Sequence, residues 1–142
     1  MKQYQAGIRT TNGTTTEASL EIIAGARGFR LVGIFGVALA AATASVFGIG
    51  RPAALGVTPT SPLSLKAAID GTDSLAKTAL AWGTSPTVPA AFRFRISLPA
   101  TIGAFRDLPM PSEGIWVPAG TSLVLWNIGA VGVSDVHFTI ME

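Results

Sequence analysis

Alternation of apolar and polar residues is the strongest pattern in this chain, and it is clearest near the end of the sequence. Val136, Phe138 and Ile140 alternate there with polar residues, and residues 115–117 and 123–126 form two further apolar runs between turn-forming residues. Because the side chains of a strand point alternately to opposite faces, this period of two predicts strands with one buried face. Residues 114–140 are therefore expected to help close a β-barrel or β-sandwich.

Further strands are predicted earlier in the chain. Residues 16–23 and 92–98 alternate in the same way, and the former segment is expected to have one exposed face. Residues 3–10 are followed by Asn12-Gly13, a typical hairpin turn, so a first strand is expected to turn back there. In all, the pattern predicts about eight or nine strands and almost no helix. The residues predicted to be buried in the core are Phe94, Ile96, Trp126, Val136, Phe138 and Ile140.

A long uncharged segment allows two interpretations. Residues 31–50 lie between Arg30 and Arg51, and this length and flanking are typical of a transmembrane helix. Their glycines and β-branched residues suit strands better. We therefore expect two strands, residues 29–39 and 44–50, joined as a hairpin with both faces covered. A small membrane protein that spans at residues 31–50 is the less favoured alternative.

Proline-rich segments interrupt the strands at residues 51–62, 83–90 and 99–113. Proline has no N–H to donate to a sheet, so residues 51–62 are expected to form a long loop or a sheet edge, and the other two segments are expected to form surface loops. Between them, residues 63–70 are predicted to form a short strand or a helical turn. Residues 74–82 are predicted to form a strand, with a helix as the alternative.

Length and composition predict one domain, residues 1–142, with an all-β fold: an antiparallel β-sandwich with long proline-rich loops. Charged residues make up only 13% of the chain, about half the usual share, and 49% is hydrophobic. So few charges leave apolar surface patches, which are typical of subunits in assemblies. The net charge of +2 and the scattered basic residues do not favour nucleic-acid binding, and no signal peptide is expected.

Candidate catalytic residues are sparse. The chain has no cysteine, which excludes thiolate nucleophiles and ligands, and its one histidine is His137. Asp135 lies on the same face of that strand, about 6–7 Å away, and such a pair could orient a base for Ser134 or Thr139. Triad members normally converge from different elements, however. We therefore expect a surface histidine in a protein that is not an enzyme and holds no cofactor.

Metal and sugar sites are also weakly indicated. Asp70 and Asp73 flank a glycine and a threonine in a pattern that faintly resembles the start of a calcium loop, but the glutamate that would complete such a loop is missing. A turn is the expected role, and no metal site is predicted. Trp82, Trp116 and Trp126 could stack on sugar rings, but each lies in an apolar run, where a core or interface tryptophan is more common.

Three segments carry a resemblance to a known class of protein: residues 46–53, 81–89 and 114–127. They resemble small virion proteins of tailed bacteriophages, in particular the decoration or cement proteins that sit outside the capsid shell and are commonly jelly rolls forming dimers or trimers. The resemblance runs over most of the chain from about Val46 onward. It implies an eight-stranded jelly roll without catalytic residues, made in the host cytoplasm and located on the capsid surface.

The predicted function is therefore structural: the protein binds the outside of a phage capsid shell and stabilises it through subunit contacts. Its expected partners are the major capsid protein of the same virion and further copies of itself, as a homodimer or homotrimer, with no nucleic acid and no membrane. The alternative is a carbohydrate-binding β-sandwich or fibre-tip module that uses exposed tryptophans.

Docking is predicted to use the proline-rich segments, because they carry apolar residues that a solvated loop does not need. Proline also lowers the conformational entropy that such a loop loses when it orders on a partner. Arg51 and Arg106 are expected to pair with acidic groups of the neighbour and to set register. The candidate interface residues are Arg51, Leu55, Val57, Val88, Phe105, Arg106, Leu108 and Met110.

Overall fold

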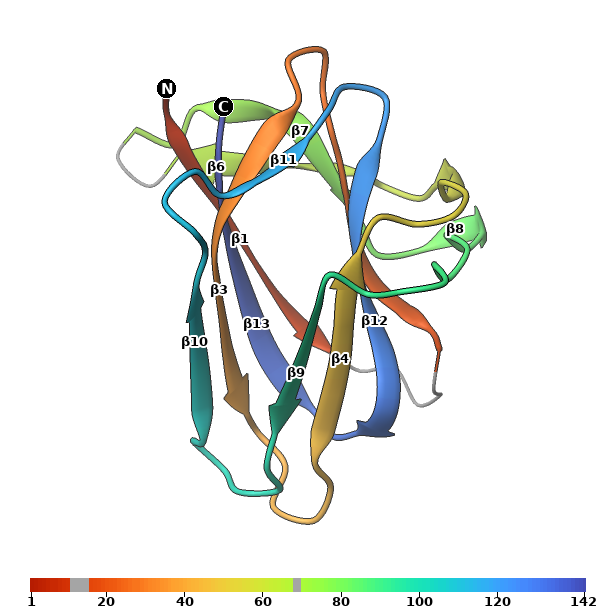
Figure 1. Ribbon diagram of the computed structural model, residues 1–142, viewed down its shortest axis with the longest axis vertical. Coiled ribbons are helices and arrows are strands. Elements are labelled where there is room, and N and C mark those ends of the chain that lie inside the picture. Colours follow the sequence, from red (N-terminus) through yellow and green to blue (C-terminus); the bar gives the residue numbers. More distant parts are fainter. Residues whose placement is uncertain (11–15, 68–69) are drawn as a thin grey trace.

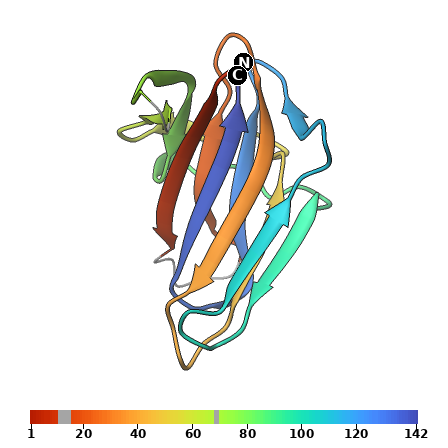
Figure 2. The same cartoon turned by 90° about the vertical axis from the view of Figure 1, so that its left-hand side faces the viewer.

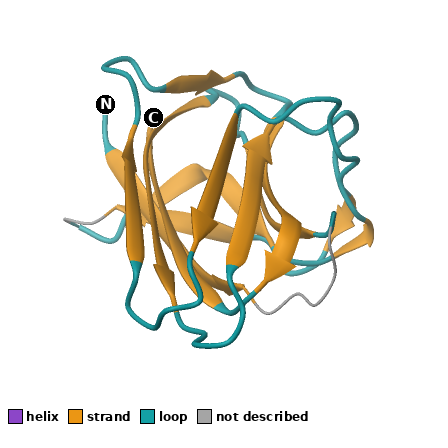
Figure 3. Cartoon of the chain, turned by 60° about the horizontal axis from the view of Figure 1, so that its bottom comes forward, coloured by secondary structure: helices purple, strands orange, loops and turns teal. Residues whose placement is uncertain are grey.

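The computed structural model describes residues 1–10, 16–67 and 70–142, and all regular structure within these ranges is β (Figure 1, Figure 3). The described residues contain no helix long and apolar enough to cross a membrane, and residues 31–50 lie in two strands and the loop between them. The thirteen strands of the described part are β1 (Gln3–Thr10), β2 (Ala18–Ile23), β3 (Phe29–Ala38), β4 (Ser45–Gly50), β5 (Val57–Pro59), β6 (Leu63–Ala67), β7 (Asp73–Ala79), β8 (Trp82–Thr84), β9 (Phe94–Leu98), β10 (Phe105–Pro109), β11 (Ile115–Val117), β12 (Ser122–Val131) and β13 (Ser134–Met141).

Eleven of these strands form one antiparallel sheet that curls into a nearly closed barrel (Figure 1). Along the sheet the order is β10-β3-β13-β1-β6-β7-β2-β12-β4-β9, and β11 also pairs with β3. The two end strands, β10 and β9, come close to each other but do not pair. The remaining strands, β5 and β8, pair only with each other.

Eight of the strands make up two opposed walls. We call β10-β3-β13-β1 wall A and β2-β12-β4-β9 wall B; the β6–β7 hairpin joins them on one side. Most successive wall strands of the chain lie on alternate walls, so the connections cross from one wall to the other (Figure 1, Figure 2). Closure of the sheet therefore depends on pairings between strands far apart in the sequence.

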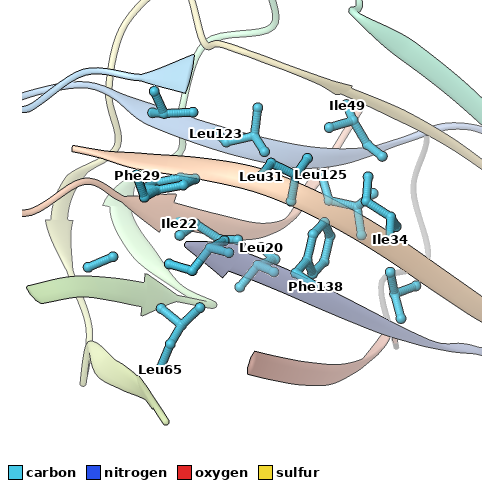
Figure 4. Packing of buried hydrophobic residues seen from close by; sticks show 14 of the residues in the cluster. Leu20, Ile22, Phe29, Leu31, Ile34, Ile49, Leu65, Leu123, Leu125 and Phe138 are labelled. Atoms are coloured by element: carbon cyan, nitrogen blue, oxygen red, sulfur yellow. The ribbon is translucent and has the colours of Figure 1, made fainter. Parts of the chain in front are cut away.

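The main core fills the space between the walls. Leu20 and Ile22 from β2 meet Phe29, Leu31 and Ile34 from β3, and all five side chains are buried (Figure 4). Burial on this scale removes enough apolar surface from water to drive folding of a single domain. Of the residues predicted to lie in the core, Ile96, Trp126, Val136, Phe138 and Ile140 are buried. Phe94, the first residue of the end strand β9, is only half-buried.

The predicted hairpin of the uncharged segment is wrong, although both of its strands are present. β3 pairs with β13, β10 and β11, whereas β4 pairs with β12 and β9. The two strands belong to different walls and do not pair with each other. The predicted Asn12-Gly13 turn lies outside the described residues, and the strands on either side of it, β1 and β2, pair with other strands.

The predicted exposed face of residues 16–23 is also wrong. Ser19 and Glu21 of β2 are buried along with their apolar neighbours. The cover is supplied by residues 51–62 and 82–92, which we call the flap: β5 pairs with β8, and Ala54 bridges to Thr87. The flap packs Trp82, Val88 and Phe92 against Trp126 of β12, on the outer side of wall B.

The prediction of a loop for the third proline-rich segment is wrong in part, because a strand occupies residues 105–109. β10 pairs with β3 along its whole length and has no partner on its other side. Pro109 is the last residue of this end strand, which is where a sheet accepts a residue without an N–H. The segments predicted as strand or helix, residues 63–70 and 74–82, contain β6 and β7 as strands.

Candidate binding surfaces

The predicted interface residues of the flap separate into two kinds. Leu55 and Val57 are exposed, Val57 by 56%, and both lie on the stretch that pairs or bridges with the other half of the flap. Val88 is half-buried and packs against the cluster around Trp126. Leu55 and Val57 thus remain available to a partner, and Val88 contributes to holding the flap in place.

The candidate residues on β10 and just after it also separate into exposed and half-buried ones. Phe105 is 62% exposed, whereas Leu108 and Met110 are half-buried against the main core. Alternation along the strand explains this, because residues separated by an odd number of positions point to opposite faces. Arg106 is exposed. Of the apolar candidates in this segment, Phe105 is the one that presents most of its side chain to solvent.

Arg51 has contacts within the chain. Its Nη2 donates a hydrogen bond to the backbone oxygen of Trp116 at 2.7 Å. Its Nε is buried and has no acceptor among the described residues. A second guanidinium, that of Arg30, lies 5.5 Å from the centroid of the Trp116 ring, which is 45% exposed. Arg51 therefore joins the end of β4 to β11, and its predicted pairing with an acidic neighbour stays a prediction.

The outer face of wall A carries a row of aromatic rings. Phe35 on β3 stacks on Phe105 of β10 with centroids 5.7 Å apart, and the ring of His137 on β13 lies 6.4 Å from that of Phe35. His137 also covers Gly7 of β1, where an added Cβ would lie 2.7 Å from the ring. Glycine at position 7 is thus what allows the histidine ring to lie flat across β1. The sequence did not indicate this row, because its members come from three separate strands.

Asp135 is paired with an arginine and not with the histidine. Arg9 Nε donates to Asp135 Oδ1 at 2.8 Å, and Nη2 donates to Oδ2 at 3.0 Å. These hydrogen bonds, and the positive charge of Arg9, hold the pKa of Asp135 below its usual value. The pair lines a shallow groove with Gly7, Ile8 and His137.

The serine of the possible triad lies away from the histidine. Ser134 is buried, and its hydroxyl lies 2.6 Å from that of Ser45 on β4, inside the barrel. His137 is exposed on the outer face of the same wall. Because the serine and the histidine lie on opposite faces of β13, they cannot share a proton in this arrangement.

Glu21 is a buried carboxylate that sequence reasoning placed on a solvent face. Its Oε2 accepts a hydrogen bond from Trp82 Nε1 at 2.7 Å, and its Oε1 accepts bonds from Ser122 Oγ at 2.6 Å and from the backbone N–H of Gly56 at 3.3 Å. Trp82 and Gly56 belong to the flap, and Ser122 to β12. The carboxylate therefore fastens the flap to wall B.

Asp70 and Asp73 serve as turn and ion-pair residues. Asp70 accepts hydrogen bonds from Lys2 Nζ at 2.8 Å and from the backbone N–H of Thr72 at 3.0 Å, and these partners lower its pKa. Asp73 pairs with Lys66, which lowers its pKa as well. No group of three or more histidine, aspartate or glutamate residues within the described ranges could hold a metal ion.

Two of the exposed apolar regions involve predicted docking residues: the flap residues Leu55 and Val57, and the outer side of wall A around Phe35 and Phe105. Other large apolar side chains are exposed elsewhere, among them Leu63, Leu80 and Ile102. Exposed apolar surface of this kind is typical of contact sites. Comparisons of the chain with the models of known protein families, with curated proteins and with solved structures found no match.

Proposed function

We propose that the protein is a jelly-roll subunit of a bacteriophage virion that attaches to the outside of the capsid shell and stabilises it. The strand order supports the jelly roll. The eight strands of the two walls divide into β1-β13-β3-β10 and β2-β12-β4-β9, which is the order of two Greek keys folded onto each other. The flap and the β6–β7 hairpin are then insertions between β4 and β9. Because this fold hosts many functions, the attachment has to be argued from the surface.

One observation carries the attachment: exposed apolar side chains lie on backbone that is already held in place. Val57 belongs to β5, which pairs with β8, and Phe105 belongs to β10, which pairs with β3. Ordered backbone loses little conformational entropy when a partner binds, so more of the free energy of apolar burial is kept as affinity. Arg106 is also exposed, on the other face of the end strand β10, and supplies a charge at its edge that can set the register of the contact.

Attachment can be tested by sedimenting the purified chain with empty shells assembled from the major capsid protein of the same phage. We expect the wild-type chain to sediment with the shells. Phe105→Ala should reduce the bound fraction severalfold while the melting temperature stays nearly unchanged, because most of the Phe105 side chain is in solvent. Leu75→Ala is the matched control, since Leu75 is also exposed but lies on β7, away from both predicted docking regions.

A wild-type chain that stays in the supernatant, or a Phe105→Ala variant that binds like the wild type, would contradict this assignment. Leu108→Ala should behave differently from Phe105→Ala. Leu108 packs against the core, so its truncation is expected to lower the melting temperature.

Carbohydrate binding is the second candidate, and a specific observation keeps Trp116 in it. The ring of Trp116 is nearly half exposed, and Arg30 lies beside it to offer hydrogen bonds to hydroxyl groups. Trp126, by contrast, is fully buried and cannot meet a sugar in this structure. Binding on a glycan array that Trp116→Ala abolishes, with the fold intact, would favour this candidate over shell attachment.

A further inference from the structure

The outer face of wall A has no cover. In Figure 2, β1, β13, β3 and β10 lie side by side toward the viewer with no other element in front of them. The corresponding face of wall B is covered by the flap. In register across wall A, Gly7 faces His137, His137 faces Phe35, and Phe35 faces Asp107.

This face has the composition of a contact surface with an apolar centre and a polar rim. Phe35 is 36% exposed, and His137 and Phe105 are exposed. Gly7 and Gly33 have no side chain, so nothing projects from the sheet at these positions beside the rings. Aromatic residues in the middle and polar residues at the edge are typical of protein–protein interfaces. The rim includes the Arg9–Asp135 ion pair.

We propose that the outer face of wall A binds the same face of a second copy of this chain, forming a two-fold symmetric dimer. The area is sufficient. With strands about 4.8 Å apart and about 3.4 Å of rise per residue, four strands and the eight-residue pairing of β1 with β13 give about 500 Å² per face. Two such faces bury about 1,000 Å², the lower limit for a specific interface. The dimer is therefore reversible and depends on concentration.

The charges of this face fit a second copy better than a strongly charged partner. Arg9 and Asp135 already neutralise each other within the chain, and the other two charged residues among the described outward positions of the four strands, Arg30 and Asp107, have opposite signs. A nearly neutral face meets little repulsion from its own copy and attracts no highly charged molecule. A two-fold axis also requires that one patch be complementary to itself, and a flat aromatic centre meets that requirement.

The proposal does not rest on attachment to a shell, because it is tested on the purified chain alone. Phe105 belongs to both predicted contacts, so a copy that binds a shell through Phe105 cannot at the same time dimerise through this face. Sedimentation velocity over a range of micromolar concentrations should show a monomer–dimer equilibrium. Phe35→Lys should shift the chain to monomer, because it places two like charges opposite each other in the apolar centre. Leu75→Lys, at an exposed position outside this face, should leave the equilibrium unchanged. The melting temperature of each variant shows that it is folded.

A second measurement locates the contact. The chain has no cysteine, so one introduced thiol is unique. Thr139→Cys places it on the outer face beside Gly33, where opposed sheets about 10 Å apart allow a short bis-maleimide to join two copies. Cross-linked dimer from Thr139→Cys, with little from Leu75→Cys, supports the proposal. A wild-type chain that is monomeric at every concentration, a Phe35→Lys variant that remains dimeric, or equal cross-linking at both positions overturns it.

Discussion

The outer faces of the two walls differ in a way that the strands themselves do not explain. On wall B, the outward residues Glu21 and Trp126 are completely buried. On wall A, the outward residues Phe35 and His137 meet solvent. The difference comes from the flap: residues 51–62 and 82–92, which lie between β4 and β9 in the sequence, pack over wall B, and no segment of the described chain does the same for wall A.

Two consequences follow for how the molecule is built. In wall B, β2 and the first part of β12 form the middle layer between the main core and the small cluster of Trp126, Trp82, Val88 and Phe92, so they are buried on both sides. Wall A has one packed side and one open side, the usual state of an antiparallel sheet. A side chain of the same chemical type should therefore affect stability on wall B and association on wall A.

The largest expected effect is on the buried aromatic residue of wall B. Trp126→Ala should reduce the free energy of unfolding by about 3–5 kcal/mol, because it removes the centre of the small cluster and leaves a cavity. Phe35→Ala on wall A should change it much less, since its ring is partly in solvent. Urea unfolding of both variants measures the difference. Equal losses would mean that the two outer faces are covered to the same extent.

The indole N–H of Trp126 sharpens this test. Its Nε1 is buried and has no hydrogen-bond acceptor among the described residues. Trp126→Phe keeps most of the apolar volume and removes an unsatisfied donor, so it should cost clearly less than Trp126→Ala. Similar costs for the two substitutions would indicate that the N–H has a partner in solution.

The buried carboxylate of wall B is expected to give the next largest effect. Glu21→Ala leaves the N–H groups of Trp82 and Gly56 and the hydroxyl of Ser122 without their acceptor. A buried donor left without an acceptor or a water molecule costs about 1–3 kcal/mol. We expect the free energy of unfolding to fall by about 2–4 kcal/mol in total, because water can reach some of these donors. Urea unfolding gives the cost.

Glu17→Ala is the matched control for Glu21→Ala, because Glu17 is an exposed glutamate close in sequence. A cost for Glu21→Ala no greater than that of the control would show that the flap is held by the apolar contacts of Trp126 alone.

The alternating pattern predicted the inner faces well. In β13, Val136, Phe138 and Ile140 are buried as the period of two required, because an inward residue meets the core whatever the strand order is. The outer faces could not be predicted in this way. Glu21 alternates with apolar residues just as a solvent-facing residue would, and its burial depends on a flap that follows β4 in the sequence.

Strand pairing was the other limit. Sequence proximity suggested that β3 and β4 form a hairpin. In this topology, however, successive wall strands mostly lie on opposite walls, and the partners of β3 come from residues 105–141. Periodicity determines which residues share a face and carries no information on which strand lies alongside. The candidate surfaces show the same limit: Leu55, Val57 and Phe105 of the proline-rich segments are exposed, and their docking role stays a prediction, but the aromatic row of wall A combines three strands that the sequence keeps apart.

The smallest expected effect concerns the ion pair on wall A. Arg9 holds the pKa of Asp135 below its ordinary value of 3.8, so the native state favours the charged carboxylate more than the unfolded chain does. The resulting stabilisation is complete above about pH 4 and is lost as the pH falls through the lower pKa of the folded state. Because both side chains contact water, the effect is small and is weakened by salt.

Asp135→Asn should therefore melt slightly below the wild type between pH 5 and pH 7, and the gap between the two melting temperatures should close as the pH approaches 2. A gap that persists at pH 2 would show that the Asp135 side chain acts through packing or neutral hydrogen bonds, which would make the rim of wall A more like the buried Glu21 site on wall B than its exposure suggests.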